Sequence, residues 1–315
     1  MLLVACDYFE SFVPFVLNTH TKLNTMKNTI GLKLIDEELL YKVLSIPSCS
    51  RQEQCVQSFL MEHARLHGFA AKLDDKGNVY LRKGSLPQGE FFPCVTAHMD
   101  TVHYSHIPFI DENKPIPLQT QEGYNEHYIY AEGFGLGGDD KAGIVVALTI
   151  MEKLQACKAV FFVEEEIGCG GSDLAELSWF SDVGYIIAFD SPGRNCASWA
   201  CSGVILFSRE FYETFLEELG PKYGLTRFEA HPYTDVMVLR MNTCLACMNF
   251  GAGYYNYHSY DEFVVAEDMD HAVDMGLYLI GRLGHQEYVI PFTPHHLNDD
   301  DQDYDYFTKK FARKQ

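Results

Sequence analysis

The sequence predicts an α/β protein with a mixed, mostly parallel central sheet flanked by helices. Three runs, at residues 91–97, 159–164 and 184–189, are apolar along almost their whole length, which is typical of strands buried on both faces of a parallel sheet. The helical pattern at residues 140–155, which we expect to form an amphipathic helix, lies between the first two runs, as a β-α-β crossover requires. With 315 residues, of which 47% are hydrophobic, the chain is long enough to bury the core of such a domain.

Further elements precede and follow this central part. Apolar residues recur at helical spacing in residues 36–47 and 52–67, and two short strands at 69–73 and 78–82 flank a turn sequence, Asp-Asp-Lys-Gly. After residue 202 the same patterns predict a strand at 203–208, helices at 209–220 and 234–240, a strand at 243–249 and a last helix at 267–284.

The composition argues against two classes of partner. A formal net charge of −20 at pH 7 repels phosphate backbones, so we expect no nucleic acid partner, and it argues against a basic membrane-binding face. No apolar stretch is long enough to span a membrane, and the first residues lack the basic segment of a signal peptide. The ten cysteines have no framework spacing, so we expect reduced thiols in a cytoplasmic protein, with Cys244 and Cys247 in a core strand rather than at a metal.

Residues that can bind a metal follow the apolar runs, at the points where the strands are expected to end. They are His98 and Asp100, Asp139 and Asp140, Glu164, Glu165 and Glu166, Asp190 and, further along, His258. Open sheets of this kind bind ligands at the carboxyl ends of their strands, so we expect these side chains to converge. Converging, partly buried carboxylates repel one another and need a positive charge nearby. Imidazole and carboxylate donors together favour zinc, with manganese or cobalt as weaker fits.

Five segments carry a resemblance to a known family. They are AHMDTV (97–102), GLGGDDKAG (135–143), VEEEIG (163–168), AFDSPG (188–193) and GAGYYNYHSYDEF (251–263). In this order they resemble the peptidase T and aminoacylase group of two-zinc exopeptidases and amidohydrolases, over residues 36–284. The resemblance implies a phosphorylase/hydrolase-like zinc exopeptidase domain that binds two zinc ions and acts on a short peptide or another small amide.

The resemblance also implies which residues bind the metals. His98 and Asp190 would bind the first zinc, and Glu166 and His258 would bind the second. Asp139, directly before the Asp-Lys dipeptide, would bridge the two ions. Two metals held close together need a carboxylate of this kind, because its two oxygens can serve one ion each.

Two further carboxylates are assigned to catalysis by the same resemblance. Asp100 would lie beside His98 and fix the orientation of its ring, and Glu165 would be the general base. Hydrolysis of an amide by a hydroxide held between two metals needs an unligated carboxylate that takes up a proton and passes it to the leaving amine.

Other polar residues near the site have plainer explanations. Asp140 is expected to cap the helix that follows it, and Glu164 to face solvent or support its loop. We expect His103, His106 and His127 to be ordinary surface residues.

The sequence departs from peptidase T in one respect. Those enzymes insert a lid domain between the third carboxylate ligand and the final histidine, but only 68 residues separate Asp190 from His258 here. We therefore expect a compact catalytic domain at residues 26–290, with an open active-site face that the loop Tyr254–Tyr260 helps to line. Residues 1–25 are predicted to be an N-terminal extension, and residues 291–315 a solvated, mobile tail that is first acidic and then basic.

Three functions are compatible with this sequence. The first is a zinc exopeptidase, either an aminopeptidase or a di- or tripeptidase. The second is an amidohydrolase that acts on N-acyl amino acids or other small amides. The third is a metal-binding relative without turnover, which the presence of Glu165 argues against because such a protein has little need for a general base.

Overall fold

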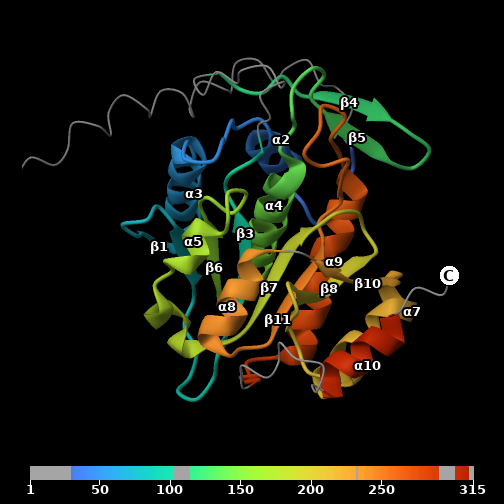
Figure 1. The fold of residues 1–315 in the computed structure, drawn as a ribbon. Helices are drawn as coiled ribbons and strands as arrows, with labels where there is room; N and C mark the ends of the chain where they lie inside the picture. The colour runs from blue at the N-terminus through green and yellow to red at the C-terminus, as the bar shows by residue number, and fades with distance from the viewer. Residues whose placement is uncertain (1–29, 103–113, 232, 291–301, 312–315) are drawn as a thin grey trace, which may run out of the picture. The chain divides into compact units, whose positions relative to one another are not determined.

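Figure 1 shows the fold as a computed structural model, in which residues 30–102, 114–231, 233–290 and 302–311 are described. The chain divides into two units, Met1–Gly31 and Leu32–Gln315, and the account below concerns the second. The predicted N-terminal extension lies outside the described residues, as do His103 and His106.

A nine-stranded sheet forms the centre of the second unit (Figure 1). Its strands are β1 (Ala70–Leu73), β2 (Val79–Lys83), β3 (Phe92–His98), β6 (Cys157–Phe162), β7 (Val183–Ser191), β8 (Cys196–Cys201), β9 (Val204–Ile205), β10 (Arg227–His231) and β11 (Cys247–Gly251). They lie in the order β1-β2-β6-β3-β7-β11-β8-β10, and β9 pairs with β8. The four central strands, from β6 to β11, are parallel neighbours, whereas β1 and β2 on one side and β8 and β9 on the other pair antiparallel. The predicted mixed α/β sheet is therefore confirmed.

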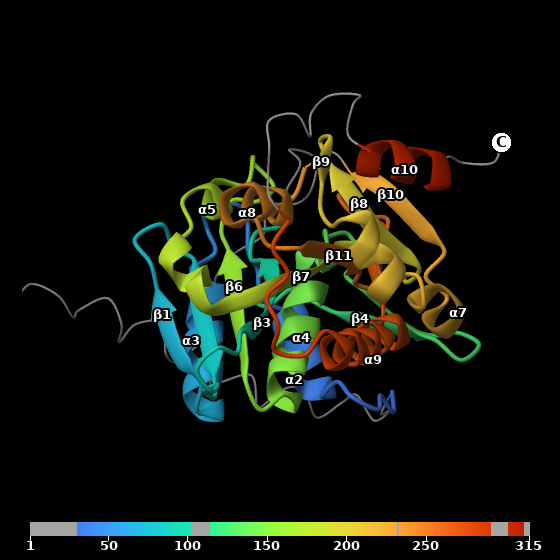
Figure 2. The same cartoon turned by 90° about the horizontal axis from the view of Figure 1, so that it is seen from below.

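Helices cover both faces of this sheet (Figure 2). They are α2 (Glu37–Leu44), α3 (Gln54–His67), α4 (Gly138–Lys153), α5 (Gly170–Asp173), the 3-10 helix η3 (Leu177–Asp182), α6 (Arg209–Phe211), the π-helical turn η4 (Tyr212–Leu216), α7 (Leu219–Tyr223), α8 (Asp235–Thr243), α9 (Ala266–Leu283) and α10 (Gln302–Phe311). In Figure 2, α2, α4 and α9 lie on one side of the sheet, and α5 and α8 lie on the other.

Helix α4 lies against β3 and β7 and is buried from Gly138 to Met151. We predicted an amphipathic helix here, which is wrong, because α2 and α9 cover the side of α4 that faces away from the sheet. The segment is apolar on every side, and such a helix belongs in a core. This packing fixes the position of the N-terminus of α4 relative to the carboxyl ends of β3 and β7.

A second, four-stranded antiparallel sheet lies beside the first and was not predicted. It consists of β4 (Gln119–Glu122), β5 (His127–Tyr130), β12 (Tyr254–Tyr255) and β13 (Phe263–Val265), in the order β12-β13-β5-β4. Its strands are only two to four residues long, so periodicity carries little signal for them. His127, expected on the surface, binds Glu267 of α9 at 2.6 Å and fixes this sheet to that helix.

Several strands and helices have different boundaries in the structure from those that the sequence predicted. The strand expected at 159–164 ends at Phe162, and of the strand expected at 203–208 only Val204–Ile205 is formed. The helix expected at 209–220 is divided into α6, η4 and α7, and β8 and β10 were missed. Cys247 is buried in β11 as expected, whereas Cys244 ends α8 in a left-handed conformation.

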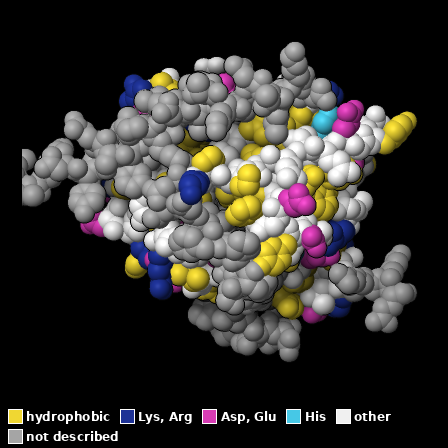
Figure 3. Space-filling view, turned by 90° about the horizontal axis from the view of Figure 1, so that it is seen from above, with side chains coloured by type: hydrophobic (Ala, Val, Ile, Leu, Met, Phe, Trp, Pro, Cys, Tyr) yellow, Lys and Arg dark blue, Asp and Glu magenta, His cyan; other side chains and the backbone are white. Residues whose placement is uncertain are grey.

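The surface carries charge of both signs. On the face shown in Figure 3, acidic, basic and hydrophobic side chains are scattered over the part that is described. Among the described residues, no helix has the length and hydropathy needed to cross a membrane.

The prediction of a solvated, mobile tail is wrong for residues 302–311. These residues form α10, and Phe307 is fully buried among aromatic rings, with centroids 5.6 Å from Trp199, 5.5 Å from Phe207 and 5.7 Å from Tyr212. The charged composition of the tail hid this apolar contact, because only Phe307 and its neighbours on the same face of α10 take part.

Replacing Phe307 with alanine tests whether α10 is an integral part of the fold. Deleting a fully buried phenylalanine side chain removes about 3–5 kcal/mol from the free energy of unfolding. We expect Phe307→Ala to lower the midpoint of urea unfolding clearly, whereas Lys309→Ala, at an exposed position of the same helix, changes it little. Equal midpoints for both variants would show that the packing of Phe307 contributes nothing to the free energy of unfolding.

Candidate metal centre

The predicted site residues meet at the carboxyl edge of the central sheet. Strands β6, β3 and β7 are parallel neighbours, so their carboxyl ends lie side by side. His98 is the last residue of β3, Asp190 lies near the end of β7, and the N-terminus of α4 brings in Asp139. His258 arrives from the loop that connects β12 to β13. Residues up to 160 positions apart thus form one cluster.

The Asp139 carboxylate lies between the two histidines. Its Oδ1 is 3.1 Å from Nε2 of His98, and its Oδ2 is 3.3 Å from Nε2 of His258. Each oxygen therefore faces a different imidazole, which is the arrangement expected of a carboxylate that bridges two ions.

Each histidine has a second carboxylate near the same nitrogen. Oδ1 of Asp190 is 3.6 Å from Nε2 of His98, and Oε1 of Glu166 is 2.9 Å from Nε2 of His258. All five residues predicted to bind metal are thus brought together, in the two sets that the sequence assigned.

Asp100 lies behind His98 as predicted, although the contact differs from the expected one. The closest acceptor to Nδ1 of His98 is the backbone carbonyl of Asp100, at 2.8 Å, and the carboxylate Oδ1 is 3.5 Å away. The carboxylate accepts hydrogen bonds from Ser50 Oγ and from the backbone N–H groups of Glu165 and Glu166. Asp100 therefore orients the histidine and the loop after β6 together.

The three consecutive glutamates have different surroundings. Because β6 ends at Phe162, they lie in a loop, and the alternation of a strand no longer separates Glu165 from Glu166. Glu165 is 4.0 Å from Nε2 of His98, farther than Asp139 or Asp190. Glu164 instead pairs with Lys76 at 2.7 Å, so it supports its loop, as one of its two predicted roles required.

Asp140 caps the regular part of α4, as expected. Its carboxylate accepts hydrogen bonds from the backbone N–H groups of Gly143 and His98, at 3.0 and 3.3 Å. A Cβ at Gly143 would collide with this carboxylate, so the glycine leaves room for the cap. Asp139 and Asp140 are joined by a cis peptide bond.

Sequence reasoning missed Glu262, which is buried beside Asp139. Its Oε2 accepts from the Gly137 N–H at 2.7 Å, and its Oε1 accepts from the Asp139 N–H at 3.0 Å. Burial raises its pKa to about 7. Glu262 lies four residues after His258, in the last of the five segments. Its position as an acidic residue next to a run rich in aromatic residues is the only feature of the sequence that could have indicated its role.

Asp190 is held by two more residues that the sequence analysis did not single out. Thr234 Oγ1 donates to Asp190 Oδ2 at 3.0 Å, and the side chain of Asn249 exchanges hydrogen bonds with the Asp190 backbone, at 2.8 and 2.9 Å. These contacts fix the carboxylate against β11 and α8.

The crowding of ionisable groups shifts their pKa values. Burial alone would lower the pKa of His98, but Asp100, Asp139 and Asp190 raise it well above its usual range. Burial raises the pKa of Glu166 to about 7, and it also raises the pKa of Glu165. Protons or cations must therefore offset the negative charge of this cluster.

The second histidine shows the same effect. Asp139 and Glu166 outweigh burial and raise the pKa of His258 to about 10. The two histidines in turn hold the pKa of Asp139 below its usual range in spite of burial.

A pocket of about 340 Å³ opens onto this cluster. Tyr254 and Tyr257 line it, as expected of their loop. The full set of lining residues is Asp139, Glu165, Glu166, Gly168, Asp190, Pro192, His231, Tyr233, Thr234, Asn249, Tyr254, Tyr257 and His258. The carboxylates are thus accessible to a small polar ligand.

The donor set fits divalent transition metals. Asp139, Glu166 and His258 offer ligand atoms that lie within 4.8 Å of one another, and so do His98, Asp140 and Asp190. Ligand atoms of a tetrahedral zinc ion lie about 3.3 Å apart, since each is about 2.0–2.1 Å from the metal. The distances around Asp139 are of this size.

Comparisons of the sequence find relatives that the chain matches in part. It is 24% identical over 182 residues to the cytosol non-specific dipeptidase of Escherichia coli, and 38% identical over 65 residues to the [LysW]-lysine hydrolase of Deinococcus radiodurans. These matches cover 56% and 21% of this chain, and 37% and 17% of the relatives' own lengths. No protein-family model matches the chain.

Comparison of the structure identifies the fold. The aminopeptidase PepT of Bacillus cereus superposes with a TM-score of 0.63 at 15% sequence identity, and the match covers 80% of this chain and 100% of that one. The chain thus has the fold of peptidase T-type aminopeptidases, as the five segments predict.

Replacing Glu262 tests whether it holds the loop that carries Asp139. In Glu262→Ala two buried N–H groups lose their acceptor, so Asp139 is no longer fixed. Loss of a residue that supports a metal ligand reduces metal affinity by about 10- to 100-fold. We expect a decrease of this size in zinc affinity, measured by competition with a chelator.

Glu262→Gln is the matched variant, since it keeps one carbonyl acceptor and carries no charge. We expect it to lose less affinity than Glu262→Ala. An alanine variant with unchanged affinity would contradict the role of Glu262.

Proposed function

We propose that this chain is a zinc-dependent exopeptidase that cleaves the peptide bond at the end of a short peptide, as an aminopeptidase or a di- or tripeptidase. One observation carries the proposal: the two oxygens of Asp139 face two different imidazoles, with a further carboxylate beside each. This arrangement suits two metal ions about 3.5–4 Å apart, which is the spacing used by two-metal aminopeptidases.

The metal ligands of the proposal are the five residues that the sequence assigned. His98 and Asp190 would hold one zinc, Glu166 and His258 would hold the other, and Asp139 would serve both. Manganese or cobalt could replace zinc with the same donors. When bound, such ions supply Lewis acidity toward the scissile carbonyl and lower the pKa of water.

Glu165 is the proposed general base. It lines the pocket and lies farther from His98 than the ligand carboxylates do, so it remains available for proton transfer. It would accept a proton from the attacking water and pass it to the leaving amine. Asp100 would act as a positioning residue through its contacts with His98 and with the loop that carries Glu165.

A compact catalytic domain without an inserted lid is part of the proposal, and it includes α10, beyond the boundary at residue 290 that the sequence predicted. Support comes from the described residues between Asp190 and His258, whose strands β8, β9, β10 and β11 all belong to the nine-stranded sheet. An open face would admit a short peptide from solvent into the pocket that Tyr254 and Tyr257 help to line. The names of the dipeptidase and aminopeptidase relatives favour a peptide substrate, and the cytosolic dipeptidase is compatible with the predicted cytoplasmic location.

The second candidate is an amidohydrolase that acts on N-acyl amino acids or another small amide. The match to a lysine hydrolase favours it, over a segment of 65 residues. The same centre would serve both reactions, so the two candidates differ only in what the pocket accepts.

Asp139→Asn tests the two-metal centre. Because Asp139 faces both histidines, its replacement is expected to remove both ions, whereas a ligand to one ion would affect that ion first. We expect the variant to carry about two zinc ions per chain fewer than wild type after zinc loading and dialysis, by elemental analysis. Glu176→Gln, which alters an ion pair with Lys72 outside the centre, is the control. Equal metal contents in all three proteins would refute the centre.

A substrate panel tests the function. Zinc-loaded protein is assayed with free dipeptides, tripeptides, amino-terminally blocked peptides and N-acyl amino acids. Cleavage of free peptides supports the exopeptidase, and cleavage of N-acyl amino acids alone supports the second candidate. A protein that binds zinc but cleaves none of them would be a metal-binding relative without turnover.

In the same assay, Glu165→Gln is expected to lower kcat by at least about 100-fold, the usual contribution of a general base. Its zinc content should stay that of wild type, because Glu165 is not a ligand in the proposal. Glu166→Gln should lose metal instead. Glu164→Gln, next in the chain but paired with Lys76, is the control and should keep its activity. Near-normal turnover in Glu165→Gln would reject this assignment.

A further inference from the structure

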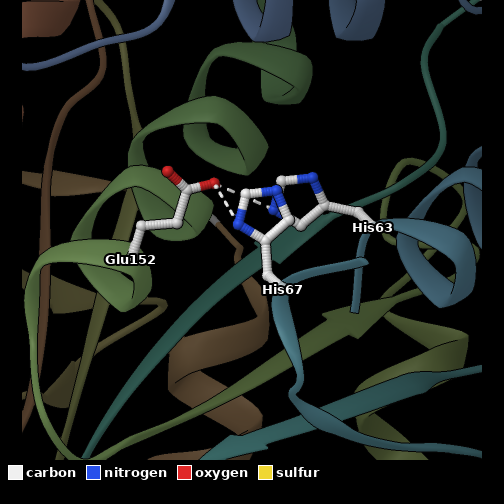
Figure 4. A group of neighbouring side chains, drawn as sticks. All are labelled: His63, His67 and Glu152. Atoms are coloured by element: carbon white, nitrogen blue, oxygen red, sulfur yellow. Dashed lines mark ion pairs between the residues drawn. The ribbon is translucent and has the colours of Figure 1, made fainter. Parts of the chain in front are cut away.

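Two histidines and a glutamate meet away from the candidate metal centre. His63 and His67 are one helical turn apart in α3, so their side chains share one face of the helix. Glu152 reaches them from the last turn of α4 (Figure 4). The sequence of either helix alone does not predict this contact, because Glu152 is far from the two histidines along the chain.

The contact distances suit a shared ion. Oε1 of Glu152 lies 3.0 Å from Nε2 of His63 and 3.5 Å from Nδ1 of His67, as the dashed lines in Figure 4 mark. Donor atoms of a tetrahedral zinc ion lie about 3.3 Å apart, and the three ligand atoms here lie within 4.8 Å of one another. Two histidines and a glutamate are also a ligand set that zinc uses in proteins.

The buried histidine nitrogen supports this interpretation. The His63 side chain is only 8% exposed, and its Nε2 has no hydrogen-bond partner among the described residues. Glu152 Oε1 is close enough to this nitrogen for a hydrogen bond, but it does not lie in the direction in which a ring N–H would point. Two atoms that bind the same metal ion are placed in this way, because each points at the ion and not at the other atom. Without an ion, a buried polar nitrogen remains unsatisfied.

Aromatic rings surround the cluster on one side. The two imidazole rings stack with centroids 4.1 Å apart, and Phe59 and Phe69 lie next to them. Lys83, a cation near the cluster, donates to the backbone carbonyls of Met151 and Glu152 and does not pair with the Glu152 carboxylate.

The cluster is remote from the candidate metal centre. Asp139 and Glu152 stand near opposite ends of α4, and thirteen residues of helix span about 20 Å. Ligands at one end therefore cannot reach an ion at the other.

We propose that His63, His67 and Glu152 form a separate binding site for a divalent transition cation, zinc foremost, which links α3 to α4. His67 is 41% exposed, so the ion can enter from solvent and keep a water as its fourth ligand. The site holds the outer helix α3 against the buried helix α4 and takes no part in hydrolysis.

The test compares the zinc content of the full-length wild type with that of His67→Asn. His67 is exposed, so its replacement is compatible with folding, whereas His63 is buried. Both proteins are loaded with zinc, dialysed against zinc-free buffer and measured by elemental analysis. We expect wild type to retain one zinc ion per chain more than His67→Asn, and Glu152→Gln to show the same loss. Glu62→Gln, at a partly exposed position of the same helix, is the control and should match wild type.

The measured quantity is the difference in zinc content between wild type and His67→Asn. Zinc bound at Asp139 contributes equally to both proteins and cancels, so the result does not depend on the proposed function. Two further results are expected: zinc raises the melting temperature of Asp139→Asn, and this rise is lost when His67→Asn is added. Peptide hydrolysis by His67→Asn should equal that of wild type. Equal zinc content in wild type and His67→Asn, both folded by circular dichroism, would overturn the site.

Discussion

The burial of many carboxylates at one edge of the sheet is the constraint on which the rest of the structure depends. Asp139, Glu165, Glu166 and Asp190 line a single pocket, and burial raises the pKa of the last three. Their mutual repulsion has to be offset by positive charge, either protons on the two histidines or bound cations. A fold that places such a cluster in its interior is therefore suited to metal binding.

A ring of supporting contacts holds this charge in place. Asp100 joins the end of β3 to the loop after β6, and Glu262 joins the last loop to the start of α4. Thr234 and Asn249 fix Asp190. None of these residues needs to touch an ion to matter, because a ligand contributes fully only when its orientation is set beforehand.

Helix α4 connects the two regions in which metal ligands are proposed. Its N-terminus carries Asp139, and its last turn carries Glu152. The helix is buried against β3 and β7, so both ends are placed by the same packing. This explains how a residue outside the family motifs comes to face two histidines of α3.

The sequence by itself determined the central sheet, because apolar runs of this length mark strands that are buried on both faces. Its resemblance to two-zinc exopeptidases singled out the five candidate ligands and the candidate general base. The tertiary structure alone decided what depends on contacts between distant segments. It placed Glu262 on the Gly137–Asp139 backbone, showed that Phe307 packs in an otherwise charged tail, and brought Glu152 to His63. Periodicity describes one element at a time, whereas these contacts join elements that only packing brings together.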